Sequence, residues 1–153
     1  MDVKIINPIL AAFSEILPQI GFCSVRKKGV SLVESCVAYE GVLVNIALLG
    51  SIKGVVLIGM SMDSAKQVVS KMMMGMEVPT LDSLAQSALS EMGNMVVANS
   101  CMQFNKIGIE GLDISPPTVL ISESGTATLP VKKAIKLSFS VDDIDVNVYV
   151  GLE

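Results

Sequence analysis

Hydrophobic residues recur every three or four positions in three stretches of the chain, which is the spacing of amphipathic helices. We expect these helices over residues 7–22, 64–75 and 82–105. Short polar side chains near each start can accept hydrogen bonds from the free N–H groups of a first turn. The expected N-caps are Asn7, then Ser61 or Asp63, then Thr80 or Asp82, with Pro8 in a first turn, Pro18 near the end of the first helix and Gly75 as the stop of the second.

Elsewhere the residues alternate between hydrophobic and polar or form short apolar runs, and both patterns predict strands. The expected strands are residues 23–28, 31–39, 41–50, 53–60, 112–122, 134–141 and 144–152. The first two would form a hairpin around Lys28-Gly29, the next two a buried pair joined by a Gly-Ser turn, and the last two a hairpin around Asp142-Asp143. The segment 112–122 would be extended around a Pro pair, and residues 124–130 are expected to form a loop.

Helices and antiparallel hairpins in this order predict an α+β fold, with an antiparallel sheet of hairpin-connected strands packed against three helices. The 153 residues suffice for one domain, so we expect residues 1–153 to form a single unit. An internal pseudo-duplication is possible, because "LAAFSEILPQIG" in the first helix resembles "AQSALSEMGNMV" in the third. This alignment places Glu15 on Glu91, and Pro18 opposite Asn94.

The composition narrows the class of protein. The chain is 51% hydrophobic, but its richest stretch, residues 41–60, is interrupted by Asn45, Ser51 and Lys53, so no apolar run approaches the roughly 18–20 residues of a spanning helix. The N-terminus has no basic region followed by an apolar one, so no secretion signal is expected. We therefore expect a soluble protein, and we expect the methionines of "KMMMGM" to fill irregular space in its core.

Several kinds of chemistry are excluded by residue content. The chain has no histidine, which removes Ser-His and Cys-His nucleophile pairs and the usual zinc sites. Its three cysteines lack a C-x-x-C spacing, so we expect them to be reduced core residues of a cytoplasmic protein. The net charge of −4, without a basic stripe, argues against nucleic-acid binding. Any chemistry must use carboxylates, amides, hydroxyls or the groups of a partner.

One polar stripe follows the third helix. At about 100° per residue, Ser87, Glu91, Asn94 and Ala98 fall on one side of a helix. The predicted apolar face lies opposite and consists of Leu81, Ala85, Ala88, Leu89, Met92 and Val96. We therefore expect the stripe to point away from the core, whereas Asn99 falls on the apolar side and is expected to be a buried amide bonded to a turn or strand.

This stripe is either a solvated face or a functional one. Residues 72–105 include no Lys or Arg, so Glu91 has no cation in its own helix. The expected surface neighbours of Asn94 are small or compact: Ser90, Gly93, Val97 and Ala98. A mid-helix glycine costs roughly 1 kcal/mol relative to alanine, so Gly93 indicates that a side chain is unwelcome where another molecule approaches. These features favour a functional face.

An amide side chain can position a water molecule by donating one hydrogen bond and accepting another. Positioning alone is enough only for a bond that is already reactive, such as an acyl phosphate, whose cleavage depends on alignment and charge neutralisation. Asn94 could therefore align a water, while Glu91 could bind a lysine of the partner. The reaction would then be shared between two proteins.

The chain resembles the CheX branch of the CheC/CheX/FliY family of chemotaxis phosphatases. The family signature is Asp or Ser, three residues, Glu, two residues and Asn, which here reads Ser87-x-x-x-Glu91-x-x-Asn94. Similar segments occur in the same order along the chain: "NPILAAFSEILPQIGF", "SVRKKGVSL", "KMMMGMEVPTLDSLAQSALSEMGNMVVANS" and "DISPPTVLIS".

The resemblance implies a phosphatase that acts on a phosphorylated CheY-like response regulator. It assigns Asn94 to the water that attacks the aspartyl phosphate and Glu91 to the active-site lysine of the regulator, and Ser87 matches the leading position of the signature. Ser87 and Ala98, which share the stripe with this pair, are expected to be partner-binding positions. It also implies that Mg²⁺ is held by the regulator and that no cofactor is bound by this chain. Because Pro18 replaces the amide in the first helix, one site per chain is expected, as in CheX, and the family further implies a homodimer formed through edge strands.

Two rivals to this function differ in class. A hydrolase with its own nucleophile would need a base to activate a serine, and without histidine no evident candidate exists. A non-catalytic module would use the same helix to bind a response regulator, or to dock into a flagellar switch or receptor complex. Substitution of Asn94 separates catalysis from binding.

Overall fold

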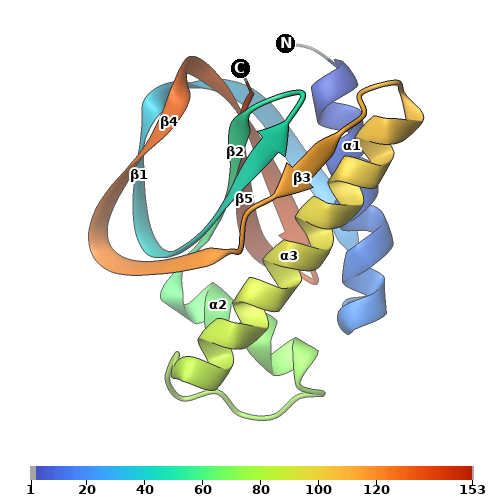
Figure 1. The fold of residues 1–153 in the computed structure, drawn as a ribbon. Coiled ribbons are helices and arrows are strands. Elements are labelled where there is room, and N and C mark those ends of the chain that lie inside the picture. Colours follow the sequence, from blue (N-terminus) through green and yellow to red (C-terminus); the bar gives the residue numbers. More distant parts are fainter. Residues whose placement is uncertain (1–2, 153) are drawn as a thin grey trace.

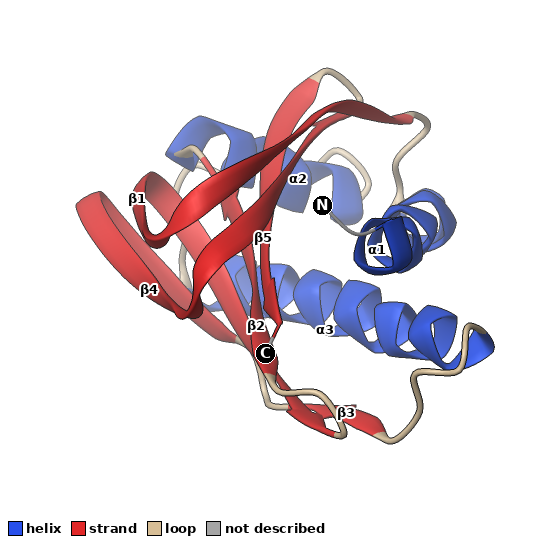
Figure 2. Ribbon diagram, turned by 90° about the horizontal axis from the view of Figure 1, so that it is seen from above, coloured by secondary structure: helices blue, strands red, loops and turns tan. Residues whose placement is uncertain are grey.

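The computed structural model describes residues 3–152, in which helices pack against an antiparallel sheet (Figure 1). This confirms the predicted α+β class. The helices are α1 (Val3–Ile16), the short 3-10 helix η1 (Leu17–Ile20), α2 (Met62–Met72) and α3 (Ser83–Lys106). The strands are β1 (Val25–Gly50), β2 (Gly54–Met60), β3 (Leu112–Ile114), β4 (Thr118–Val141) and β5 (Ile144–Leu152). Seen from above, α1 and α3 lie along the same side of the strands (Figure 2).

Two long strands organise the sheet. β1 and β4, of 26 and 24 residues, run antiparallel to each other, and each turns back into a shorter strand, β2 or β5. The two shorter strands also pair with each other, so the order is β2-β5-β4-β1-β3 with an additional β2–β1 ladder. A helix, a long strand and a short strand thus occur in this order in both halves of the chain, with α2 between the halves and β3 before the second long strand. An internal duplication stays a prediction.

The hairpin expected around Lys28-Gly29 was wrong, because residues 25–50 form the single strand β1. Its ladder to β4 continues on both sides of this dipeptide, with the register shifting between Lys27 and Gly29. Further shifts occur between Glu34 and Cys36 and between Tyr39 and Gly41. Such bulges bend a strand and increase its twist without ending it. The turn-like residues therefore mark a bend in β1.

The loop expected at residues 124–130 was also wrong, because this segment lies within β4. Its partner is β1, where Gly125 pairs with Tyr39. A Cβ atom on Gly125 would lie 2.4 Å from the Tyr39 ring. The glycine is thus required by a tyrosine that packs across the ladder, and it does not signal a turn.

The first helix begins earlier than expected. Asn7 is not its N-cap, since α1 starts at Val3 and Pro8 lies inside it. Proline removes one backbone hydrogen bond, but the buried side chains of Ile6 and Ile9 on either side hold the segment against the core. The expected end near Pro18 is confirmed by the change to the 3-10 helix η1.

The N-caps of α2 and α3 are residues that the sequence predicted for these positions. Ser61 caps α2 by accepting a hydrogen bond from the backbone N–H of Ser64 at 3.0 Å. Asp82 caps α3 by accepting from Ala85 N–H at 2.9 Å. Each was one of two predicted candidates, and the satisfied N–H groups stabilise a helix by about 1 kcal/mol.

The predicted β4–β5 hairpin is confirmed, and its turn is anchored to distant parts of the chain. Asp142 and Asp143 both adopt left-handed backbone conformations, with φ of 49° and 66°. The Asp142 carboxylate accepts hydrogen bonds from the backbone N–H groups of Cys23 and Ser24 and pairs with Lys71 Nζ at 3.2 Å. Burial raises the pKa of Asp142, but these hydrogen bonds and the charge of Lys71 outweigh burial, so its pKa lies below the ordinary value.

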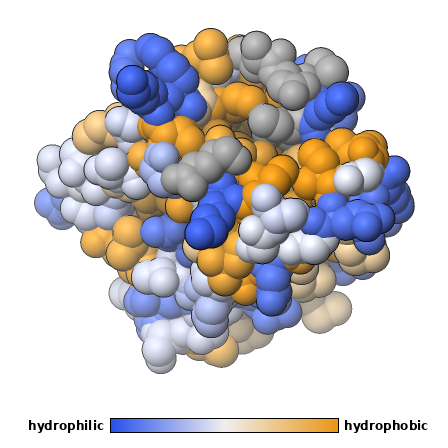
Figure 3. All heavy atoms as spheres, turned by 45° about the horizontal axis from the view of Figure 1, so that its top comes forward, coloured by the Kyte–Doolittle hydropathy of each residue, from blue (hydrophilic) through white to orange (hydrophobic). Residues whose placement is uncertain are grey.

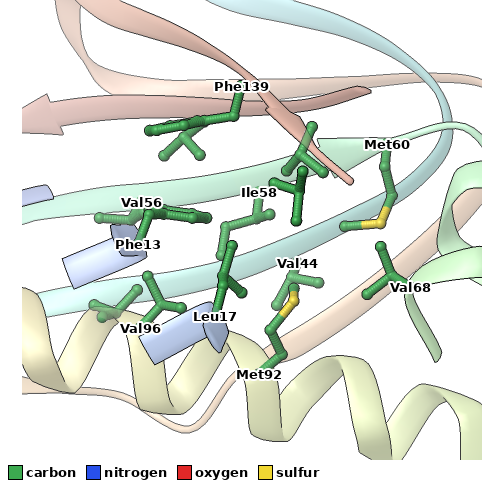
Figure 4. Close-up of a cluster of buried hydrophobic side chains, with 14 of the residues drawn as sticks. Phe13, Leu17, Val44, Val56, Ile58, Met60, Val68, Met92, Val96 and Phe139 are labelled. Atoms are coloured by element: carbon green, nitrogen blue, oxygen red, sulfur yellow. The ribbon is translucent and has the colours of Figure 1, made fainter. Parts of the chain in front are cut away.

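The core has two parts. The larger one fills the space between the helices and the sheet, where the rings of Phe13 and Phe139 stack at 4.6 Å between centroids (Figure 4). A smaller cluster lies on another part of the strands and contains Val37, Leu43, Leu57, Leu129, Ala134 and Tyr149. Adjacent residues of β1 and β2 thus belong to different clusters, which explains the apolar run at residues 41–60. Among the described residues, no helix is long and apolar enough to cross a membrane.

Two expectations about sulfur-containing residues need correction. Met72 and Met73 pack against the core, but Met74 and Met76 are 98% and 62% exposed, because α2 has already ended at Met72. All three cysteines are free, yet only Cys101 is half-buried, whereas the other two are exposed. On the face of the molecule drawn in Figure 3, hydrophobic groups lie between polar ones.

Candidate functional site

Helix α3 presents the predicted stripe on the side away from its buried residues. Ser87 and Glu91 are exposed, while Asn94 and Ala98 are half-buried. Of the residues predicted for the opposite face, all are buried except Ala88, which is half-buried and packs against the core. The 3.6-residue period therefore oriented this helix correctly.

An open depression of about 500 Å³ lies beside this helix. It is lined by Ser83, Gln86, Ser87, Ser90, Glu91, Asn94, Pro117 and Val119. Three of the four predicted site residues thus share one depression, and Ala98 lies one helical turn beyond Asn94, outside its lining. Pro117 and Val119 were missed at the sequence level, because the Pro pair signalled only an extended link and its position beside α3 follows from the sheet.

Gly93 explains how this depression forms, and its predicted role was wrong. Gly93 and Val97 are buried, so neither belongs to the surface around Asn94. A Cβ atom on Gly93 would lie 2.9 Å from Val44 Cγ1 and 3.0 Å from Ile46 Cδ1. The missing side chain therefore allows α3 to approach β1 closely, and it does not make room for a partner.

The position of α3 over β1 places the start of β4 next to the helix. Val119 is the ladder partner of Val44, the residue that contacts Gly93. The link from β3 to β4 passes beside α3 in Figure 1. Adjacent strands lie about 4.8 Å apart, so the first residues of β4 extend past the helix and form the second wall of the depression.

Glu91 and Asn94 have no partners of their own within the described part of the chain. The ion pairs there involve Arg26–Asp143, Lys28–Asp145, Lys71–Asp142 and Lys133–Glu34, all remote from the depression in sequence. No side-chain hydrogen bond from either residue occurs among residues 3–152. Their polar atoms are therefore available to another molecule.

Glu15, the acid of the first helix that aligns with Glu91, already has a hydrogen-bond partner. Gln103 of α3 donates a hydrogen bond to Glu15 Oε2 at 2.8 Å and another to Asn99 Oδ1 at 3.2 Å. The expectation for Asn99 was thus wrong, because it is half-buried and bonds within its own helix. With Pro18 in η1 where an amide would be needed, α1 carries no acid–amide pair like that of α3.

The described residues include no group of three or more Asp, Glu, Cys or His side chains arranged to hold a metal ion. The acid–amide pair offers one carboxylate and one amide, which is too few oxygen ligands for a Mg²⁺ site built from protein alone. The chemistry available at this surface is hydrogen bonding and charge pairing with a molecule placed in the depression.

Comparison with known proteins matches the sequence of this chain to one family. A family model described as "Chemotaxis phosphatase CheX" matches residues 42–140. The "CheY-P phosphatase CheX" of Thermotoga maritima is 32% identical over 120 residues, which cover 78% of this chain and 77% of that protein.

Solved structures share the fold. A CheC-like superfamily protein from Shewanella sp. PV-4 superposes with a TM-score of 0.87 at 21% identity, covering 100% of this chain and 99% of that one. CheX in a CheX–CheY–BeF3–Mg complex from Borrelia burgdorferi gives a TM-score of 0.74 at 23% identity, with 97% of both chains covered. The α+β arrangement described above is therefore that of these proteins.

Proposed function

Since the chain belongs to the CheX family of chemotaxis phosphatases, we propose that it removes the phosphoryl group from the aspartyl phosphate of a CheY-like response regulator. The name of the Thermotoga relative, a CheY-P phosphatase, supports this substrate. So does the Borrelia complex, in which a protein of this fold is bound to CheY. The observation that carries the proposal is the unpartnered Glu91–Asn94 pair facing an open depression.

Asn94 would position the attacking water. Its amide can donate one hydrogen bond and accept another, so it can hold a water in line with the phosphorus atom. The water oxygen forms a bond to phosphorus as the bond to the aspartyl oxygen breaks, which releases inorganic phosphate and a free carboxylate. Alignment of this kind can lower the activation barrier by several kcal/mol, and by on the order of 7–11 kcal/mol in the most favourable intramolecular cases.

Glu91 would bind the active-site lysine of the regulator. Asn94 lies three positions later on the same face, so one carboxylate and one amide enter the regulator together. Without a cation of its own, Glu91 loses no existing ion pair on binding. Ser87 and Ala98, on the same side of α3, would contact the regulator around this pair.

We place the Mg²⁺ ion on the regulator. The Borrelia complex contains both BeF3 and Mg with CheX and CheY. The donor set described above, which comes from residues 3–152, does not fit a Mg²⁺ ion. When bound to the regulator, the ion would neutralise charge on the phosphoryl oxygens.

We further propose a homodimer formed through edge strands. Within residues 3–152, the segment of β1 from Val25 to Tyr39 pairs with β4 alone, so its other edge is free. The same holds for β4 from Thr118 to Thr128. Leu32 of β1 is 55% exposed, which suits contact with a second copy. We also propose that the protein is cytoplasmic, which the proposed reaction and the free cysteines support.

The test is to follow loss of phosphate from an acyl-phosphate-charged response regulator of the same organism, with Mg²⁺. Asn94→Ala should lower the rate by at least about 100-fold toward the intrinsic rate of the regulator, while much of the binding is kept. Asn105→Ala is the matched control, since Asn105 is an exposed asparagine near the end of α3 and outside the depression.

An unchanged rate in Asn94→Ala would contradict the assigned role. If the wild-type protein binds the regulator but leaves its phosphate intact, the face is an interaction surface of a non-catalytic module. The two classes of function are thereby separated with one pair of proteins.

A further inference from the structure

The depression beside the acid–amide pair has two chemically different walls. One wall belongs to α3 and is polar, with Ser83, Gln86, Ser87 and Ser90 beside Glu91 and Asn94. The other wall is apolar and consists of Pro117 and Val119, which are both half-buried. The roles proposed for Glu91 and Asn94 do not account for this second wall.

The apolar wall is held in place at both ends. Ser115 clamps the link to β1, because its backbone N–H donates to Ala47 O at 3.0 Å and its Oγ accepts from Ala47 N–H at 2.9 Å. Just beyond the link, Thr118 pairs with Asn45 of the same strand. Between these points, Pro116 and Pro117 restrict the backbone. The wall is therefore a fixed part of the sheet edge.

The helical wall is fixed as well. Asp82 accepts a hydrogen bond from Ala85 N–H at 2.9 Å, and Gln86 Nε2 donates to Leu81 O at 2.9 Å. Gly93 seats the helix on β1, as shown above. Both walls thus have their shape before any partner arrives, and a preformed site loses less free energy to ordering when it binds.

We propose that Pro117 and Val119 receive an apolar side chain from the regulator loop next to its phosphorylated aspartate, and that this contact helps to select the regulator. The inference rests on the proposed function. Glu91 and Asn94 line the same depression, so a protein whose aspartyl phosphate reaches Asn94 brings its neighbouring loop between the two walls. The loop meets hydroxyl and amide groups on one side and hydrocarbon on the other.

This contact acts on binding and not on the reacting atoms. An apolar pocket discriminates between side chains that differ by one methylene by about 10- to 200-fold. Val119→Thr keeps the branched shape suited to a strand but places a hydroxyl in the wall. We expect the Kd for the BeF3-activated regulator, and the KM for the phosphorylated one, to rise about tenfold. The single-turnover rate at saturating regulator should stay within about twofold, as for a purely binding contact.

The matched control is Val55→Thr, because Val55 is also a half-buried strand valine but packs against the smaller core cluster, outside the depression and outside the strand edges proposed for the dimer. Thermal unfolding of both variants reports whether the fold is kept. A second regulator that differs in the loop residue tests selection, since Val119→Thr should reduce the ratio of the two affinities measured with the wild-type protein.

A Kd equal to that of the wild type, or to that of Val55→Thr, would overturn the proposal. A slower saturated rate with unchanged Kd would overturn it too, because the wall would then serve the reaction. The wild-type protein distinguishes failure of this proposal from failure of the proposed function. Binding of the regulator without dephosphorylation would refute the phosphatase function, and the Kd values would still test the contact with Pro117 and Val119. Absence of binding would refute both proposals.

Discussion

Replacement of Gly93 by alanine tests how the central helix is seated. On an open helical face, Gly→Ala stabilises a protein by roughly 1 kcal/mol. In the structure, the new Cβ atom would lie 2.9 Å from Val44 Cγ1 and 3.0 Å from Ile46 Cδ1. Both of these side chains are fully buried, and branched side chains change rotamer with difficulty. The substitution must therefore shift the helix or the strand.

The expected magnitude follows from these two opposing effects. Ordinary contact begins at 3.4 Å, so atoms must separate by about 0.5 Å on the shorter contact. Overpacking of this kind costs roughly 1–3 kcal/mol, and stiff, fully buried neighbours place it in the upper half of that range. After the gain in helix propensity of roughly 1 kcal/mol, the net loss should be about 1–2 kcal/mol, or about 2–8 °C in Tm.

Urea unfolding and phosphatase assays on the same samples distinguish the explanations. We expect Gly93→Ala to be less stable and also slower toward the phosphorylated regulator, because a displaced α3 changes the width of the depression. A variant that is more stable by about 1 kcal/mol would refute this reasoning and return Gly93 to the surface. Gly29→Ala is the control, since no atom lies within 4 Å of a Cβ there.

Three further expectations concern charged groups. Asp142→Asn should lower the free energy of unfolding by about 1–3 kcal/mol at pH 7. Because the pKa of Asp142 is lowered in the folded state, its contribution to stability is complete above the ordinary value of 3.8 and is lost as the pH falls through the folded pKa. In urea unfolding, the stabilities of the variant and the wild type should therefore converge only below pH 3.8. Glu91→Lys should raise the Kd for the regulator, most strongly at low salt. Glu77→Lys should not, because Glu77 is an exposed acid on the α2–α3 link. Equal affinities of Glu91→Lys and the wild type, measured by titration, would rule out the lysine contact. Asp82→Ala should cost about 1 kcal/mol in thermal unfolding, and no loss would mean that the cap is replaced.

Local signals predicted much of the fold and the outline of the site. The helical period placed Ser87, Glu91 and Asn94 on one face, and short polar side chains marked the starts of α2 and α3. These features depend on residues within one or two helical turns of each other, so the local sequence is enough to predict them. The Asp142-Asp143 turn was also predicted from local residues, although Asp142 is further held by Cys23, Ser24 and Lys71.

The errors concern segments whose conformation is set by distant partners. Lys28-Gly29 resembles a turn, yet it lies within a strand because residues of β4 more than 100 positions later pair on both sides of it. The 124–130 segment is a strand for the same reason, and Gly125 is small because of Tyr39. Pairing of this kind overrides local propensity.

The candidate site likewise has one part that the sequence predicted and another that it did not. The sequence determined that Ser87, Glu91 and Asn94 share one outward side of α3, since a helix repeats every 3.6 residues whatever surrounds it. Only the tertiary structure decided that Gly93 faces β1 and that Pro117 and Val119 stand across from Asn94. Which strand lies beneath a helix depends on the ladder between β1 and β4, where Val44 pairs with Val119 across 75 positions of the chain. Contacts at such separations arise from the packing of the whole sheet, and no local pattern encodes them.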